Sequence, residues 1–340
     1  GLYRHRRLPY GAALSPAVCQ RTMEMILSSV KGPGKVLIFL DDILIASPTE
    51  EGLWELTAAV LKKLEEKGAR LNRKKCVFGV RKVTYLGHVI SGKGLETDPT
   101  KVQSILEAEV PRDRTQIRSF LGLVHYYGRF CPDLSTVAAP LNALLQKESP
   151  FCWSVECEQA FAKIKEMLTS APVLAHYDPA KELILACDAS PVGLGVVLSH
   201  VDDQGVEKPV AYAHRSLSET EKRYAQIDRE ALAIFWGVSK FHKFLFGREF
   251  TIVTDHKPLL RILGEKEGLP PLAAARLHRW GVFLSQYRYR LKYNKGENHG
   301  NADALSRLGS GVQENSLDAA ERFYVAQLQA VPVAAETVQE

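Results

Sequence analysis

The sequence predicts a multidomain protein that combines α/β and α+β parts. Its 340 residues are enough for two or three domains of roughly 100–200 residues each. A β-hairpin with adjacent helices is predicted near the N-terminus, helices broken by prolines follow, and strands become frequent after Glu182. The hydrophobic share of 46% is typical of a packed globular protein.

The apolar run at residues 36–46 carries two adjacent acids, Asp41 and Asp42. Such close carboxylates are costly to remove from water unless cations neutralise them. A β-hairpin whose tight turn presents both acids to a divalent metal resolves this conflict. An ordinary Asp-Asp turn between two strands is the alternative, and the run alone does not decide between the two.

The elements around this hairpin follow from helix caps and apolar spacing. Ser15 and Pro16 predict an N-cap and a first helical position, followed by a helix over residues 17–27. A second helix is predicted over residues 50–67, with an end at Gly68. The strands expected next are residues 77–78 and 83–90.

Residues 98–180 are predicted to be helical between prolines, with the strongest helices at residues 115–130 and 153–168. Strands follow, and a capping box at residues 218–221 then starts a long helix that is predicted to reach about Phe246. The remaining strands are expected at residues 183–188, 195–199, 209–213, 250–254 and 287–293, and the remaining helices near 257–263, near 272–285 and from Ala302. This order predicts a mixed α/β sheet.

The net charge of +5 is distributed unevenly. It is +7 over residues 1–97, −2 over 98–180, +4 over 181–308 and −4 over 309–340. The two basic blocks suit a polyanionic partner, and the segment between them is predicted to be a spacer. Residues 309–340 show no clear pattern and are predicted to be a flexible tail.

Cysteine use and hydropathy bear on the compartment. The 6 cysteines are scattered, which disfavours a zinc site and favours reduced thiols. No apolar stretch approaches the roughly 18 residues of a membrane span, and no signal peptide is visible. We therefore expect an intracellular protein without a membrane segment that is not secreted. Because the chain begins with Gly1, we also expect it to be a piece of a longer protein.

Four acids in the C-terminal part lie at positions where a charge is expensive. Asp188 and Asp255 each end an apolar strand, Glu230 shares the apolar stripe of a helix, and Asp303 starts the last helix. Each has an ordinary interpretation, since strand-end acids are common, an acid at a helix start complements the helix dipole, and an acid within a helix can pair with an arginine. Together they can converge at one sheet edge, where oxygen ligands suit Mg²⁺ and two such ions can support phosphodiester cleavage.

The segments around these acids resemble the RNase H active-site segments of gypsy-type LTR retrotransposon Pol proteins. Upstream, Phe39-Leu40-Asp41-Asp42 resembles the metal-binding turn of their reverse transcriptase. Further similar segments are residues 8–20 (nucleotide and template site), 71–76 and 84–90 (palm strand region and primer grip), 119–130 (thumb) and 140–174 (connection). The resemblance covers about residues 1–308.

The resemblance implies a domain order. It implies a partial reverse-transcriptase palm at residues 1–97, without the fingers and the strand that bears the first catalytic Asp. A thumb and connection at 98–180 and an RNase H domain at 181–308 follow, and then the tail. Virus-like particles in the cytoplasm, or the nucleus, are the implied locations, and protease, polymerase and integrase parts of a polyprotein are implied neighbours.

The resemblance also implies metal-dependent hydrolysis of the RNA strand of RNA–DNA hybrids. Asp188, Glu230, Asp255 and Asp303 would hold two Mg²⁺ ions, with Mn²⁺ as a substitute, and His299 would shuttle a proton or aid product release. Primer-template nucleic acid is the other implied partner. The residues expected to contact nucleic acid are Tyr10, Gly11, Gln20, Lys74, Gly87, His88, Arg276 and Arg279. For any one of the arginines, a solvated basic face is an equal alternative.

Polymerase activity is expected to belong to the full-length parent and not to this chain. The resemblance implies that polymerisation needs a third carboxylate on a palm strand upstream, whereas residues 1–40 contain a single acid, Glu24. Asp41 and Asp42 are therefore interpreted as a polymerase remnant. The alternative for the whole chain is a catalytically silent, host-retained remnant that only binds nucleic acid or a partner.

Overall fold

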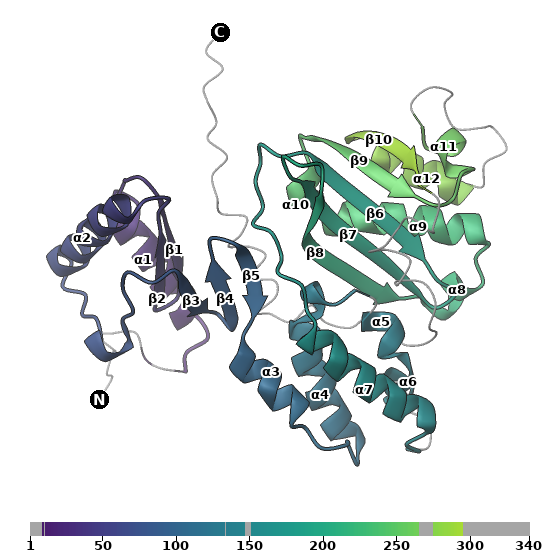
Figure 1. Ribbon diagram of the computed structural model, residues 1–340, viewed down its shortest axis with the longest axis horizontal. Coiled ribbons are helices and arrows are strands. Elements are labelled where there is room, and N and C mark those ends of the chain that lie inside the picture. Colours follow the sequence, from purple (N-terminus) through teal and green to yellow (C-terminus); the bar gives the residue numbers. More distant parts are fainter. Residues whose placement is uncertain (1–8, 10, 133, 147–150, 265–274, 295–340) are drawn as a thin grey trace, which may run out of the picture. The chain divides into compact units, whose positions relative to one another are not determined.

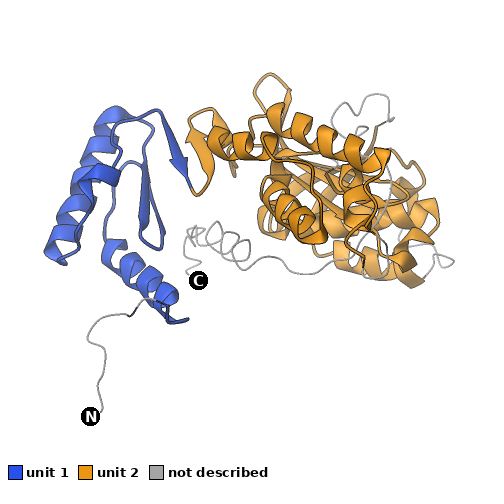
Figure 2. Cartoon of the chain, turned by 90° about the horizontal axis from the view of Figure 1, so that it is seen from below, with its two compact units in different colours: residues 1–85, 320–340 blue, residues 86–319 orange. Residues whose placement is uncertain are grey.

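The computed structural model describes residues 9, 11–132, 134–146, 151–264 and 275–294. These residues form two compact units, the first up to Tyr85 and the second from Leu86 (Figure 2). The second unit spans the domain limits expected at residues 97 and 180, so those limits stay predictions. Among the described helices, none is long and apolar enough to cross a membrane.

The first unit contains the expected hairpin between two helices. Helix α1 (Ser15–Leu27) precedes strands β1 (Lys35–Phe39) and β2 (Asp42–Ala46), and α2 (Glu50–Glu66) follows. The strands pair antiparallel with Phe39 opposite Asp42. Side chains from one face of the hairpin pack against a small core formed by the two helices; they are Val36, Ile38, Ile43 and Ile45, against Leu27, Val60 and Leu64.

The start of α1 differs from the expected cap. Ser15 is the first helical residue and Leu14 occupies the N-cap position. The hydroxyl of Ser15 donates a hydrogen bond of 2.8 Å to the carbonyl of Pro9, so it holds the preceding loop. Thr49 provides the N-cap of α2, where its side chain accepts from the backbone nitrogen of Gly52.

The prediction of a strand at residues 77–78 is wrong, and the single strand predicted at 83–90 is divided into two. A 3₁₀ turn η1 (Arg73–Lys75) precedes β3 (Lys82–Tyr85), whereas β4 (His88–Ser91) starts after a turn. Leu86 and Gly87 in this turn have φ of 49° and 70°, a left-handed conformation that breaks a strand. Strand β5 (Gly94–Thr97) then pairs antiparallel with β4.

The helical part of the second unit follows the predicted pattern with one break. Asp113 and Ser154 cap the two longest helices, α4 and α7. The helix expected over residues 115–130 ends at Tyr126 and is followed by a 3₁₀ turn, η2 (Gly128–Phe130). The helices are α3 (Pro99–Leu106), α4 (Arg114–Tyr126), α5 (Leu134–Val137), α6 (Ala139–Ala143) and α7 (Val155–Thr169).

A mixed five-stranded sheet forms the rest of the second unit, as the sequence predicts. The strand order is β10-β9-β6-β7-β8. Strands β10, β9 and β6 are parallel neighbours, whereas β6, β7 and β8 pair antiparallel. The strands are β6 (Leu183–Ala189), β7 (Gly193–Val201), β8 (Glu207–Ser216), β9 (Glu249–Thr254) and β10 (Arg288–Tyr293).

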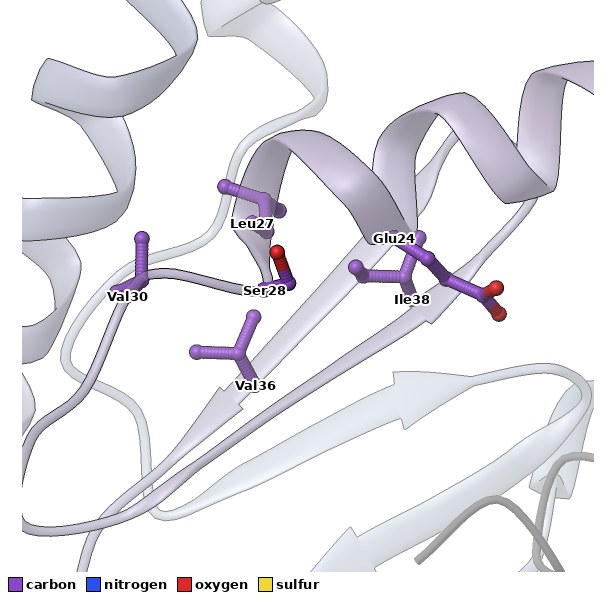
Figure 3. Close-up of a pocket in the computed structure, with 6 residues that line it drawn as sticks. All are labelled: Glu24, Leu27, Ser28, Val30, Val36 and Ile38. Atoms are coloured by element: carbon purple, nitrogen blue, oxygen red, sulfur yellow. The ribbon is translucent and has the colours of Figure 1, made fainter.

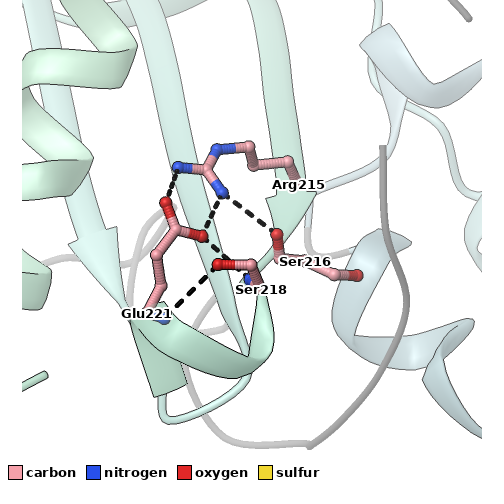
Figure 4. A network of polar contacts seen from close by, with 4 residues as sticks. All are labelled: Arg215, Ser216, Ser218 and Glu221. Atoms are coloured by element: carbon pink, nitrogen blue, oxygen red, sulfur yellow. Dashed lines mark hydrogen bonds and ion pairs between the residues drawn. The ribbon is translucent and has the colours of Figure 1, made fainter. Parts of the chain in front are cut away.

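The long helix expected from the capping box is divided into three. They are α8 (Glu219–Lys222), α9 (Gln226–Lys240) and α10 (His242–Leu245). The capping box itself is confirmed, because the Ser218 hydroxyl and the Glu221 carboxylate each accept from the other's backbone nitrogen. Arg215 binds both oxygens of Glu221 at 2.8 Å (Figure 4), which ties the start of α8 to β8.

Helices cover parts of both faces of the sheet (Figure 1). Helix α9 packs on β6 and β7, and α12 (Ala275–Leu284) packs against α9. Helix α11 (Leu259–Ile262) follows β9. On the other side, α5 and η2 contact β7 and β8. Val197 and Tyr212 belong to the core of the helical part, whereas the sheet residues that pack against α9 and α12 form a separate core.

Candidate metal centre of the five-stranded sheet

Asp188 and Asp255 lie at the same edge of the sheet. Asp188 is the penultimate residue of β6, and Asp255 directly follows β9. These strands are parallel neighbours with Ala186 opposite Val253, so the two acids are at matching positions two residues further on. Both acids therefore lie at the carboxyl ends of neighbouring strands.

Glu230 joins the two aspartates from α9. It lies in the second turn of that helix, on the stripe that packs against β6. Oxygen atoms of Asp188, Glu230 and Asp255 lie within 4.8 Å of one another. Glu230 is 2% exposed, whereas Asp255 is exposed and Asp188 is intermediate. The cluster is therefore buried at Glu230 and accessible to solvent at Asp255.

The helix approaches the sheet closely because Gly237 faces β7. A β-carbon at this position would lie 2.8 Å from Cγ1 of Val196, which is shorter than a real carbon contact. The absence of a side chain therefore lets α9 pack against β7 and bring Glu230 toward the ends of β6 and β9.

The electrostatics of the cluster favour a proton or a cation on Glu230. The pKa of Glu230 is raised to about 9, mainly by burial and also by the negative charges of Asp188 and Asp255, while the hydrogen bond from Gln226 opposes the shift. Oε2 of Glu230 is buried and has no hydrogen-bond partner among the described residues. A set of three oxygen donors with an unsatisfied buried oxygen fits a hard divalent cation.

Comparison with known proteins places these features in a family. Residues 153–252 match a family model described as an RNase H-like domain found in reverse transcriptase. Residues 1–90 match the model for reverse transcriptase (RNA-dependent DNA polymerase). The chain is 34% identical to the retrovirus-related Pol polyprotein from transposon 297 of Drosophila melanogaster, over 93% of this chain and 29% of that protein. It is 35% identical to the Tf2-7 transposon polyprotein of Schizosaccharomyces pombe, over 91% of this chain and 23% of that protein.

The chain belongs to the Pol proteins of LTR retrotransposons. It spans less than a third of the length of the relatives that it matches. The fold agrees with solved structures of a foamy viral protease-reverse transcriptase. One, with double-stranded DNA, has a TM-score of 0.73 at 23% identity over 85% of this chain and 50% of that chain. Another, with an RNA/DNA hybrid, has a TM-score of 0.72 at 22% identity over 92% and 41%.

The remaining acid and the histidine expected at the RNase H site are Asp303 and His299. Asp303 and His299 lie outside the described residues, as does Tyr10 among the expected nucleic-acid contacts. Their roles stay predictions. The structure thus brings together three of the four expected acids.

Asp41 and Asp42 lie at the hairpin turn of the first unit, and both are exposed. Among the described residues, only the cluster of Asp188, Glu230 and Asp255 gathers three potential metal ligands. Gln20 stabilises this turn. Its amide nitrogen donates to the carbonyl of Ile38 at 3.0 Å, and its amide oxygen accepts from the backbone nitrogen of Leu40. Gln20, which was expected to contact nucleic acid, is 6% exposed and supports the turn from inside the protein.

His88, expected as a nucleic-acid contact, is also inside the protein. It is 3% exposed and stacks on Tyr126 with ring centroids 5.1 Å apart. Burial lowers the pKa of His88 to about 4, so its ring is neutral at physiological pH. The hydroxyl of Tyr127 donates to the carbonyl of Gly87 at 2.8 Å. The hydroxyl of Tyr126 likewise donates to the carbonyl of Leu86. Neither contact was predicted, although the sequence shows an adjacent Tyr pair at the end of an amphipathic helix.

The other expected contacts are at the surface. Gly11, Lys74 and Arg279 are exposed. Arg276 instead forms an ion pair of 3.0 Å with Asp228 and lies over the ring of Tyr224 at 3.7 Å from its centroid. This joins α12 to the start of α9 and leaves nucleic-acid contact by Arg276 a prediction.

A pocket of about 260 Å³ in the first unit is separate from these acids. Figure 3 shows four aliphatic side chains around it, with Glu24 and Ser28. It has a single acid and is therefore not a metal site like the cluster on the sheet. The lining residues are Glu24, Leu27, Ser28, Val30, Val36 and Ile38.

Proposed function

We propose that the five-stranded domain hydrolyses the RNA strand of RNA–DNA hybrids in a metal-dependent reaction. The observation that carries this proposal is the convergence of Asp188, Glu230 and Asp255, with ligand oxygens within 4.8 Å of one another. The family match to an RNase H-like domain supports the reaction class. A related fold solved with an RNA/DNA hybrid supports the substrate class.

The metal would be held by these three residues, with Asp303 as the fourth ligand. Mg²⁺ suits an all-oxygen set, and Mn²⁺ would substitute for it. Two bound divalent ions would activate a water molecule and stabilise charge on the leaving oxygen of a phosphodiester. The contribution of the protein is to hold three carboxylates together against their mutual repulsion and to release the proton of Glu230 when metal binds.

Gly11, Lys74 and Arg279 are proposed contacts to hybrid or primer-template phosphates, because they are exposed. A basic side chain that neutralises a phosphate releases counterions, so its loss weakens binding regardless of sequence. Gln20, Gly87 and His88 would support such contacts from inside, through the turns that they hold. In longer Pol proteins each of these residues would face primer or template.

We propose that polymerase activity belongs to the longer Pol proteins. Within the described residues, Asp41 and Asp42 have no third acid in a common metal cluster, and polymerisation by two ions needs such a set. Purified 340-residue chain is therefore expected to add no dNTP to an annealed primer. Measurable incorporation by a preparation that contains no other polymerase would refute this.

Labelled RNA–DNA hybrid incubated with the purified chain tests the proposed hydrolysis. Cleavage is expected with Mg²⁺ and not with chelator, and Asp188→Asn is expected to abolish it. Asp113→Asn is a matched control, because Asp113 caps α4 away from the cluster and Asn caps a helix equally well. If the chain binds hybrid but never cleaves it, the alternative of a binding remnant is correct.

A further inference from the structure

A chain of two hydrogen bonds along α9, from Arg229 to Gln226 and from Gln226 to Glu230, ends on the buried acid of the cluster. The amide nitrogen of Gln226 donates to Oε1 of Glu230, one helical turn later. The amide oxygen of Gln226 accepts a hydrogen bond of 2.6 Å from the guanidinium of Arg229. Residues three or four positions apart are neighbours on a helix surface, so both contacts follow from their order in the chain.

The two oxygens of Glu230 therefore have different surroundings. Oε1 accepts from Gln226, whereas Oε2 is buried without a hydrogen-bond partner in the described part of the chain. A buried oxygen without a donor is unfavourable unless a proton or a cation occupies it. The pattern leaves one oxygen of Glu230 for an ion and fixes the other.

The donor is suited to this task because it carries no charge. A Lys or Arg at position 226 would form an ion pair with Glu230 and compete with a metal cation. An amide restrains the carboxylate and leaves its charge available. Gln226 is exposed at the first position of α9, so the contact with Arg229 is what restrains its amide on the outer side.

On the basis of the proposed metal-dependent hydrolysis, we propose that Gln226 is a positioning residue for the metal ligand Glu230. Its amide holds Oε1, so that Oε2 is presented to a divalent cation beside Asp188 and Asp255, and Arg229 orients the amide. Outer hydrogen-bond partners of metal ligands fix the orientation of those ligands, and their loss lowers metal affinity or activity by about 10–100-fold.

Calorimetric titration of the full chain with Mn²⁺ alone, without nucleic acid, tests this role. Gln226→Met keeps the length of the side chain and removes the amide, and we expect Mn²⁺ to bind about 10-fold more weakly. Gln103→Met is the matched control. Gln103 donates to Glu107 at 2.7 Å with the same four-residue spacing on α3, away from the cluster, and its loss is expected to leave Mn²⁺ affinity unchanged.

Hybrid cleavage by the same variants separates positioning from contact with substrate. Gln226→Met is expected to need about 10-fold more Mg²⁺ for half-maximal rate. Its KM for hybrid and its rate at saturating Mg²⁺ are expected to stay at the wild-type values. Arg229→Met, which leaves Gln226 in place, is expected to shift the Mg²⁺ requirement in the same direction by a smaller factor.

Unchanged Mn²⁺ affinity in a folded Gln226→Met variant would overturn the positioning role. A higher KM for hybrid with an unchanged metal requirement would also overturn it, because Gln226 would then contact the nucleic acid. If Gln226→Met does not fold, an unchanged Mg²⁺ requirement in Arg229→Met overturns it instead. A wild-type chain that neither binds Mn²⁺ nor cleaves hybrid would contradict the proposed function itself.

Discussion

Asp188 and Asp255 lie at the carboxyl ends of two neighbouring parallel strands, with carboxylate oxygens within 4.8 Å of each other. Glu230 reaches the same point from α9, which packs across β6. The sheet therefore supplies two acids by strand register and the helix supplies the third by its packing. Three acids that are far apart in the sequence form one site because the strand order places β6 beside β9.

The stability of the metal-free protein is expected to depend on the protonation of Glu230. Its pKa is raised to about 9 in the folded state, so between about pH 4.5 and pH 9 the folded protein binds one more proton than the unfolded chain. Stability should therefore fall as pH rises through this window, with a slope of up to about 1.4 kcal/mol per pH unit from this group. The pH dependence of the free energy of unfolding is measured by urea unfolding in the presence of chelator, for the wild type and for Glu230→Gln. Parallel pH profiles of the two proteins would contradict the raised pKa.

Metal binding is expected to release a proton from the cluster. At pH 7 Glu230 is protonated in the metal-free protein, because its pKa lies above that pH, and a bound cation requires the carboxylate. Titration with Mn²⁺ in buffers of different ionisation enthalpy counts the protons, and about one per cluster is expected. The number of protons released per cluster should fall toward zero near pH 10, because Glu230 is ionised above its pKa. A buffer-independent heat at pH 7 would show that Glu230 is already ionised.

Gly237→Ala is expected to weaken metal binding by displacing α9. The added methyl would meet Val196 Cγ1 at 2.8 Å. Overpacking of this kind costs about 1–3 kcal/mol, against a helix-propensity gain of roughly 1 kcal/mol. The double variant with Val196→Ala makes room for the methyl and should recover Mn²⁺ affinity. Wild-type affinity in the single variant would show that the close packing at Gly237 does not position Glu230.

Tyr127→Phe is expected to destabilise the second unit by about 1–3 kcal/mol, because it leaves the carbonyl of Gly87 without its donor. Tyr127 is fully buried and its hydroxyl lies 2.8 Å from that carbonyl. Chemical denaturation measures the loss. Tyr293→Phe serves as a comparison on an exposed tyrosine of β10, in the same unit. A Tyr127→Phe variant as stable as the wild type would mean that the hydroxyl contributes nothing to holding the turn.

The acids of the site were predictable because their positions conflict with an ordinary role. Asp188 and Asp255 end apolar strands, and Glu230 lies on an apolar helical stripe, so convergence was the simplest explanation for all three. The fold class, the hairpin and the capping box at Ser218 were predictable for a similar reason, since local signals agree with the final packing.

Other features were not predictable because tertiary contacts decide them. Leu86 has no preference for the left-handed conformation that ends β3, and the hydroxyls of Tyr126 and Tyr127 bind this turn from a distant helix. The roles of Gln20 and His88 also depend on burial, which polar residue types do not indicate. The end of α8 before α9 has no Gly or Pro to mark it.

Cleavage of a labelled RNA–DNA hybrid by the purified 340-residue chain tests the central claim most directly. We expect the RNA strand to be cut in Mg²⁺ or Mn²⁺, with no cleavage after chelation and none by Asp188→Asn or Glu230→Gln. The Asp113→Asn control is expected to cleave at the wild-type rate. Equal cleavage by wild type, Asp188→Asn and Glu230→Gln would contradict the assignment of the cluster as the active site.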